Sequence, residues 1–106
     1  MDKTEAAWLA GILEGEACFD FADAEKKFPR IRIEMKDEDV IQRVKDVSQG
    51  RASVRKLSRA DSNTKHADTY CFAIYDKLTV KSILQAIKPW LGDRRLAAVE
   101  EMLTAL

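Results

Sequence analysis

The sequence predicts an α+β fold in which four helices cover one face of a four-stranded antiparallel sheet. Helical and strand-like hydrophobic patterns alternate along 106 residues in the order αββαββαα. A helix followed by two strands occurs twice, and two such hairpins can pair into one sheet whose other face stays open. At this length we expect a single domain over residues 1–106, with a core that pairing with a second subunit would help to stabilise.

The first predicted helix begins at Asp2 or Thr4 and ends at Glu16. Asp2 and Glu5 have the spacing of a capping box, and residues 6–13 are apolar throughout. A helix that is apolar on nearly all sides is expected to pack against two neighbours at once. Two alternating stretches then predict a hairpin, with strands at residues 17–22 and 30–35 around a polar turn at residues 23–27.

The second half repeats this arrangement. Asp37 is expected to cap a helix that ends near Gly50. A second hairpin follows, with strands at residues 52–57 and 69–75 around a polar tip at residues 58–68. Asp76 is expected to cap a third helix that Pro89 stops, and Asp93 a last helix with apolar residues at helical spacing.

The charge distribution is uneven although the total is balanced. The chain has 18 basic and 18 acidic residues, so its net charge is zero and it is not a strongly basic domain. Residues 24–75 nevertheless hold 12 Lys and Arg against 8 Asp and Glu, a net charge of +4, and the acidic excess lies elsewhere. His66, the only histidine, falls in the predicted polar tip, where we expect a solvent-exposed residue rather than a catalytic base.

Cys18 and Cys71 are far apart in the sequence and lie in strand-like stretches, so we expect free core thiols in a reducing cytosol. The N-terminus lacks the pattern of a signal peptide, and the apolar run at residues 6–13 is too short to span a bilayer. A cytoplasmic protein without a membrane partner or a small-molecule cofactor is therefore expected.

Residues 9–19, LAGILEGEACF, form the most specific motif of the chain. Gly11 and Gly15 are four residues apart, so they share one helical face and allow a second helix to approach to backbone contact. Glu16 then stands at the C-terminal end of the helix, where the helix dipole already places negative charge. A divalent cation relieves this unfavourable arrangement, because Mg²⁺ takes hard oxygen ligands from carboxylates, carbonyls and phosphates.

This segment resembles the motif after which the LAGLIDADG homing endonucleases are named. The αββαββαα order, the start of the second helix at residues 36–37 and the link at residues 87–91 are also similar to that family, so the resemblance covers nearly the whole chain. It implies that Glu16 is a metal-binding carboxylate and that Gly15 supplies a backbone carbonyl. The implied cofactor is Mg²⁺ or another divalent cation.

Two positions depart from the family pattern. Ala17 stands where the family usually has glycine, and it can adopt the required backbone only with a negative φ or with some strain. Arg94 stands where the family often has lysine, and an arginine can hold a phosphate but cannot transfer a proton. We predict Glu16, Arg94 and Arg32 as the catalytic residues. The alternative for Arg94 and its neighbour Arg95 is an ordinary surface role in the first helical turn.

A LAGLIDADG active site needs two motif helices side by side, so one motif in a short chain implies a homodimer and a pseudo-palindromic target. The predicted dimer interface comprises Trp8, Gly11, Ile12, Glu14 and Gly15. Alternate side chains of the open sheet face are expected to enter the major groove of double-stranded DNA, with basic residues holding phosphates. The predicted DNA-binding residues are Lys26, Lys27, Arg30, Arg32, Arg55, Arg59 and Lys65.

The expected function is therefore a site-specific DNA endonuclease that makes a metal-dependent, staggered double-strand cut. Ala17 and Arg94 favour an alternative, a non-cleaving DNA- or RNA-binding protein on the same scaffold, such as an intron maturase or a transcription regulator. A third alternative is a plain α+β dimerisation module, which would bind DNA weakly and without the steep salt dependence of phosphate contacts.

Overall fold

The computed structural model describes residues 1–48, 53–57 and 68–106. Nine elements follow one another along the described chain: α1 (Lys3–Glu16), β1 (Ala17–Phe21), β2 (Pro29–Met35), α2 (Glu38–Ser48), β3 (Ser53–Leu57), β4 (Thr69–Ile74), α3 (Lys77–Ile87), the 3₁₀ helix η1 (Lys88–Trp90) and α4 (Asp93–Ala105). The predicted αββαββαα order is confirmed, with the short η1 added before the last helix.

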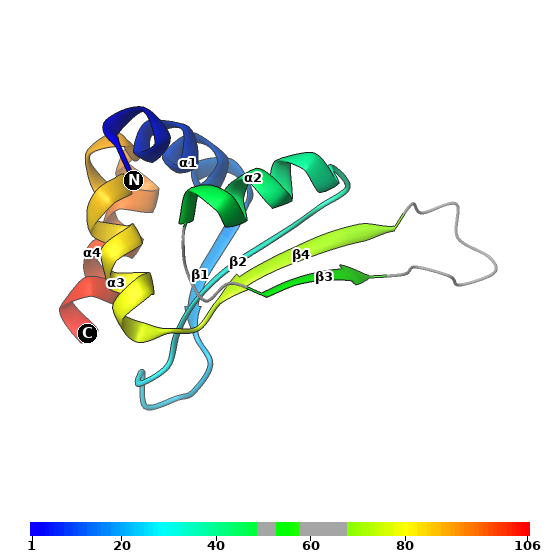
Figure 1. Ribbon diagram of the computed structural model, residues 1–106. Coiled ribbons are helices and arrows are strands. Elements are labelled where there is room, and N and C mark those ends of the chain that lie inside the picture. The colour runs from blue at the N-terminus through cyan, green and yellow to red at the C-terminus, as the bar shows by residue number, and fades with distance from the viewer. Residues whose placement is uncertain (49–52, 58–67) are drawn as a thin grey trace.

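The strands form one antiparallel sheet in the order β1-β2-β4-β3, so β2 and β4 are central. All four helices lie on one side of this sheet (Figure 1). This arrangement confirms the α+β fold class and leaves the opposite face of the sheet open.

Strand alternation decides which side chains reach the core. Ile31 and Ile33 of β2 and Phe72 of β4 face the helices and are almost completely buried. The covering helices contribute apolar residues at three- and four-residue spacing to the same core: Leu9, Ala10 and Leu13 from α1, Ile41 and Val44 from α2, Val80, Ile83, Leu84 and Ile87 from α3, and Val99 and Met102 from α4. The buried stripe of α1 leaves another face of that helix exposed.

Two of the predicted helix caps are confirmed and one is wrong. Asp2 and Glu5 form a reciprocal capping box at α1, and the Asp76 carboxylate accepts a bond from the Thr79 N–H at 3.0 Å. Asp93, by contrast, lies inside the first turn of α4, and Gly92 is the N-cap. Asp93 is still favourable in the first turn, because its negative charge interacts with the positive end of the helix dipole there.

Several predictions fall outside the described residues. These are the end of the second helix near Gly50, the start of the third strand at Ala52, and the polar tip with Arg59, Lys65 and His66. Within the described ranges, no helix is both long enough and apolar enough to cross a membrane.

Candidate nucleic-acid interface

The open face of the sheet carries the polar side of every strand. Partners in the β-ladders share a face, so Cys18 and Asp20 of β1 lie beside Arg32 and Arg30 of β2, while Glu34 lies beside Cys71 of β4, which in turn pairs with Arg55 of β3. A hollow of about 450 Å³ opens here at the end of α1, and we call it the open-face hollow. It is lined by Glu16, Cys18, Arg32, Ile33, Glu34, Arg55 and Cys71.

The structure therefore brings together three predicted site residues, Glu16, Arg32 and Arg55, from α1, β2 and β3. Glu16 is the last residue of α1, and its side chain is exposed. β1 begins at the next residue, with no loop between them, so Glu16 lies at the edge of the open sheet face.

The junction at Ala17 needs no glycine. Its φ of −84° and ψ of 152° are ordinary extended values, which any L-residue adopts without strain. Ala17 is 5% exposed and belongs to the core. The departure from the family pattern at this position therefore costs the backbone nothing.

Arg95, rather than Arg94, contacts the motif helix. Its Nε donates a bond of 2.9 Å to the Glu14 carbonyl in the last turn of α1, and its guanidinium lies 5.7 Å from the centre of the Phe19 ring. A cation here offsets the negative end of the helix dipole. Arg94 is exposed in the first turn of α4 and does not line the open-face hollow. Sequence reasoning missed the role of Arg95, because the contact spans 81 positions and no local pattern encodes it.

Asp20 holds two arginines on the open face. Its carboxylate accepts bonds from Arg30 Nε at 2.9 Å and Arg30 Nη2 at 2.8 Å, and its Oδ2 also accepts one from Arg32 Nη2 at 3.0 Å. Both arginines were predicted to bind DNA, and each now has part of its charge compensated. Sequence reasoning missed Asp20, although its place beside Cys18 on the polar side of β1 follows from the alternation of residues 17–22.

The same cluster shifts two pKa values. The bidentate bond from Arg30 lowers the pKa of Asp20, with a smaller contribution from the positive charge of Arg32 and partial opposition from burial. The bond to Asp20 in turn raises the pKa of Arg30. Asp20 is therefore a carboxylate near neutral pH.

The predicted dimer face of α1 divides into an open part and a covered part. Gly11 and Gly15 are exposed, and a Cβ built on either would meet no described atom within 4 Å apart from its chain neighbours and the backbone of its own helix. Trp8, on the same helix, is half-buried: it packs against the hydrophobic core, and the Arg43 guanidinium of α2 lies 4.2 Å from its ring centre. Ile12 and Glu14 are also half-buried. The glycines therefore leave space that one chain alone does not fill.

The prediction for the cysteines is wrong in one respect. Cys18 is exposed and Cys71 is half-buried, and both line the open-face hollow instead of the core. The reason is the register of their strands, which turns Ala17 and Phe72 inward and the adjacent cysteines outward.

The turn between β1 and β2 carries Lys26 and Lys27. Both are exposed, and each has an acidic neighbour, Glu101 at 3.9 Å for Lys26 and Glu25 at 2.9 Å for Lys27. The Asp23 carboxylate shapes the turn by accepting bonds from the N–H groups of Lys27 and Phe28. Lys26 has a positive φ of 59°, in the left-handed region that is uncommon for residues other than glycine.

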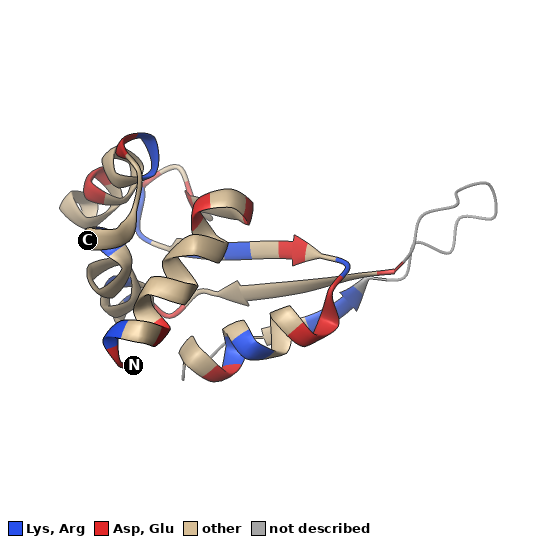
Figure 2. Ribbon diagram, turned by 90° about the horizontal axis from the view of Figure 1, so that it is seen from above, with Lys and Arg blue, Asp and Glu red and all other residues tan. Residues whose placement is uncertain are grey.

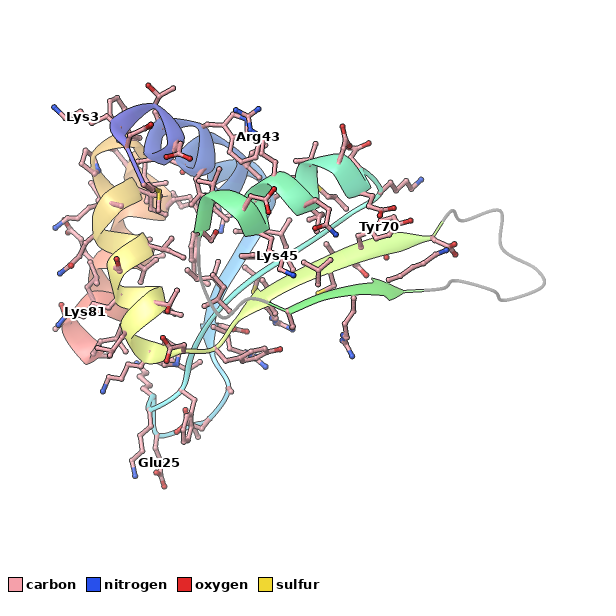
Figure 3. The ribbon with its side chains drawn as sticks, in the orientation of Figure 1. Lys3, Glu25, Arg43, Lys45, Tyr70 and Lys81 are labelled. Carbon is pink, nitrogen blue, oxygen red and sulfur yellow. The ribbon has the colours of Figure 1, made fainter. Side chains whose placement is uncertain are left out.

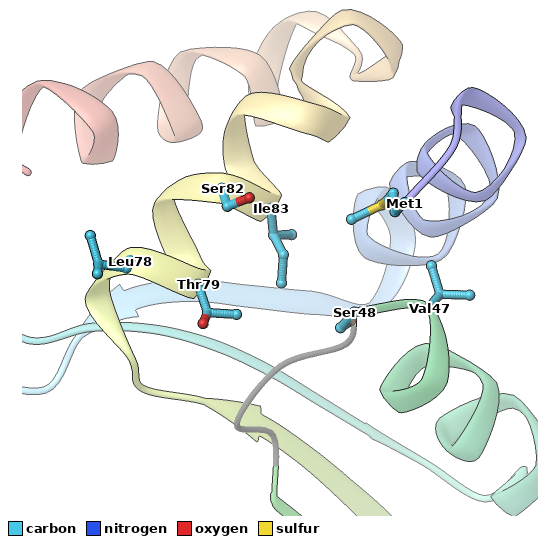
Figure 4. A pocket seen from close by; sticks show the side chains of 7 residues that line it. All are labelled: Met1, Val47, Ser48, Leu78, Thr79, Ser82 and Ile83. Carbon is cyan, nitrogen blue, oxygen red and sulfur yellow. The ribbon is translucent and has the colours of Figure 1, made fainter.

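The helical side of the molecule differs from the open face. Basic and acidic residues are interspersed along α2 (Figure 2), as in a solvated helix face. A hollow of about 310 Å³ between α3, the end of α2 and the N-terminus is lined by Met1, Val47, Ser48, Leu78, Thr79, Ser82 and Ile83 (Figure 4). None of these side chains is ionisable, in contrast to the lining of the open-face hollow.

Divalent cations bind to oxygen ligands, and the end of α1 offers two kinds. Glu16 supplies an exposed carboxylate, and the Gly15 carbonyl lies in the last turn, beyond the Leu13 and Glu14 carbonyls that Ala17 N–H and Arg95 occupy. Among the described residues, no three His, Cys, Asp or Glu side chains converge. Glu16 and the Gly15 carbonyl are too few to hold a hard cation by themselves, so further oxygen ligands would have to come from a second chain, from water or from a phosphate.

Comparison with known proteins identifies the scaffold. No family model matches the chain, and no curated protein sequence matches it. A crystal structure of the homing endonuclease I-CvuI, in complex with its target in the presence of 2 mM Ca, matches with a TM-score of 0.70 at 16% identity. The chain has the fold of I-CvuI.

A second I-CvuI structure, in complex with the I-CreI target in the presence of 2 mM Mg and with the DNA not cleaved, matches with a TM-score of 0.72 at 14% identity. In both comparisons the match covers 96% of this chain and 65% of the I-CvuI chain. The fold is thus shared over almost all of the present sequence, and about a third of the I-CvuI chain lies outside the match.

Proposed function

We propose that this protein is a single-domain DNA endonuclease of the LAGLIDADG type. It works as a homodimer and makes a staggered, divalent-metal-dependent double-strand cut at a pseudo-palindromic target. The observation that carries the proposal is the placement of Glu16. It ends a helix whose Gly11–Gly15 face is unfilled in one chain, and it borders a hollow with Arg32 and Arg55 on an open sheet face. The I-CvuI structures support it, because they show this fold in complex with target DNA.

Dimerisation through α1 would bring two Glu16 carboxylates together. The glycine face permits close approach of two helices, and a two-fold axis between them would place each helix end beside its copy. Two carboxylates that meet at two helix C-termini repel each other, and this arrangement favours a site for a cation. Glu16 and the Gly15 carbonyl of each protomer are the proposed ligands.

A bound divalent cation would supply Lewis-acid chemistry at the scissile phosphate. The chain's own residues would position the DNA around it. Arg55 lines the same hollow as Glu16 and would hold a backbone phosphate of the strand next to the cut. Arg95 would keep the end of α1 in place through its bond to the Glu14 carbonyl, while Arg94 would meet a phosphate from the exposed first turn of α4.

A non-cleaving DNA- or RNA-binding protein on the same scaffold is the second candidate. The observation that favours it is the pairing of Arg32 with Asp20, since a charge already compensated is less available to stabilise a developing charge. The second candidate keeps the dimer and the open-face interface but lacks cutting.

One experiment separates the two candidates. Wild type and Glu16→Gln are incubated with a plasmid library of candidate targets, with Mg²⁺ and with EDTA. If the protein is an endonuclease, linear plasmid should appear only with wild type and Mg²⁺. Glu16→Gln should still bind the target in a gel-shift assay. Binding by wild type without any nicked or linear product would support the second candidate and refute cleavage.

A further inference from the structure

The geometry of Arg30 leaves one edge of its guanidinium available. A guanidinium has five N–H donors in a planar fork. Arg30 directs Nε and Nη2 at the two oxygens of Asp20, and this bidentate bond fixes the plane of the group. Within the described part of the chain no group accepts a bond from Nη1. The Nη1–Nη2 edge therefore points away from Asp20, and such an edge bonds O6 and N7 of guanine.

Arg32 is held by the same carboxylate. Its Nη2 donates to Asp20 Oδ2 at 3.0 Å and lies 3.8 Å from Cys18 Sγ, while its Nε is buried without a partner among the described residues. The buried Nε and the bonded Nη2 restrict the side chain, so the donors left for a ligand are those of Nη1 and the second N–H of Nη2, which has only the weak acceptor Cys18 Sγ beside it. The Arg32 side chain is 40% exposed and lines the open-face hollow.

The two guanidinium groups are also fixed relative to each other. Both Nη2 atoms bond the same oxygen, at 2.8 and 3.0 Å, so they are no more than about 6 Å apart. Successive nucleotides of a B-DNA strand are about 3.4 Å apart along the axis. The spacing suits two neighbouring bases and excludes two bases at opposite ends of a half-site.

We propose that Asp20 is a positioning residue that orients Arg30 and Arg32 to read two neighbouring guanines in each half-site. This inference rests on the proposed function, because it requires the open sheet face to lie in the major groove. Asp20 also places a negative charge on the DNA-facing surface and so weakens binding to phosphates in general. It thus lowers the affinity for any duplex and raises the selectivity for one kind of sequence.

These two effects have opposite signs, and an experiment can separate them. Site selection from a randomised duplex library gives the base preference of the full-length protein, and titration at several salt concentrations gives the number of counterions released. We expect wild type to select adjacent guanines in each half-site. In Asp20→Ala, preference for those guanines should fall about tenfold, while binding to unrelated duplex becomes tighter and releases about one more counterion.

Glu25→Gln is the matched control. Glu25 lies at the outer end of the β1–β2 turn (Figure 3) and pairs with Lys27. Like Asp20→Ala, this variant removes one negative charge from the hairpin and leaves a basic side chain without its acidic partner. It should tighten binding to unrelated duplex but leave the guanine preference unchanged. Arg30→Lys keeps the charge without the fork and should lose the preference at one of the two positions only.

Asp20→Asn keeps the shape of the side chain and replaces Asp20→Ala if thermal unfolding shows that the alanine variant is not folded. A guanine preference that survives loss of the Asp20 charge would overturn the proposal, and so would an equal loss of preference in Glu25→Gln. Failure of wild type to bind any duplex in a salt-dependent way would instead refute the proposed function itself.

Discussion

The substitution Gly11→Ala should change the stability of the monomer and the affinity of the dimer in opposite directions. Gly11 lies within α1, and a Cβ at this position would meet no described atom within 4 Å apart from its chain neighbours and the backbone of its own helix. Alanine is more favourable than glycine inside a helix by about 0.8 to 1.0 kcal/mol, so the unfolding free energy of the isolated chain should rise by about that amount.

The same substitution should weaken the proposed dimer. Each protomer would add one methyl group to an interface in which two helix backbones are in contact, and overpacking costs about 1 to 3 kcal/mol per site. Two sites cost at least about 2 kcal/mol, which corresponds to a Kd raised about 30-fold. The variant should thus be the more stable monomer and the weaker dimer.

Sedimentation velocity over a range of concentrations measures the Kd, and urea unfolding at high dilution measures the stability of the monomer. Gln85→Ala, at an exposed position of α3, is the control and should leave the Kd unchanged. If Gly11→Ala dimerises as strongly as wild type, the glycine face of α1 is not the interface. If its monomer is less stable than wild type, the space around Gly11 is not open.

Three further predictions concern stability. Arg95→Ala removes the bond to the Glu14 carbonyl and should lower the unfolding free energy in urea by about 1 to 2 kcal/mol, and no loss would mean that the bond is unimportant in solution. Ala17→Gly should also destabilise, by about 1 kcal/mol, because the methyl is buried and φ is already negative, whereas a gain in stability would contradict this account of the junction.

The third concerns pH. Because the pKa of Asp20 is lowered on folding, its stabilising contribution is complete above the ordinary aspartate pKa of 3.8 and is lost as the pH falls through the lower folded value. The difference in unfolding free energy between wild type and Asp20→Asn should therefore be constant from about pH 5 to pH 7 and shrink below about pH 4. A difference that grows on acidification would contradict the ion pair with Arg30.

Local patterns in the sequence were sufficient for the order of elements and for most of their ends. The capping box of Asp2 and Glu5 and the cap at Asp76 involve residues three apart, so they can be recognised without the fold. Alternation in residues 30–35 likewise predicted a strand, and Ile31 and Ile33 of that strand are buried because a strand turns successive side chains to opposite faces. The motif at residues 9–19 also predicted Glu16 at the end of a helix, because the end of α1 and the start of β1 are contiguous in the sequence.

Only the tertiary structure decided which of the polar residues meet. The bond from Arg95 to the Glu14 carbonyl depends on how α4 packs against the end of α1, and the order β1-β2-β4-β3 brings Arg55 into the same hollow as Glu16. Strand register set the pairing of Asp20 with Arg30 and turned both cysteines to the open face. These contacts join residues far apart in the chain, and their geometry follows from the packing of the whole core rather than from any local preference.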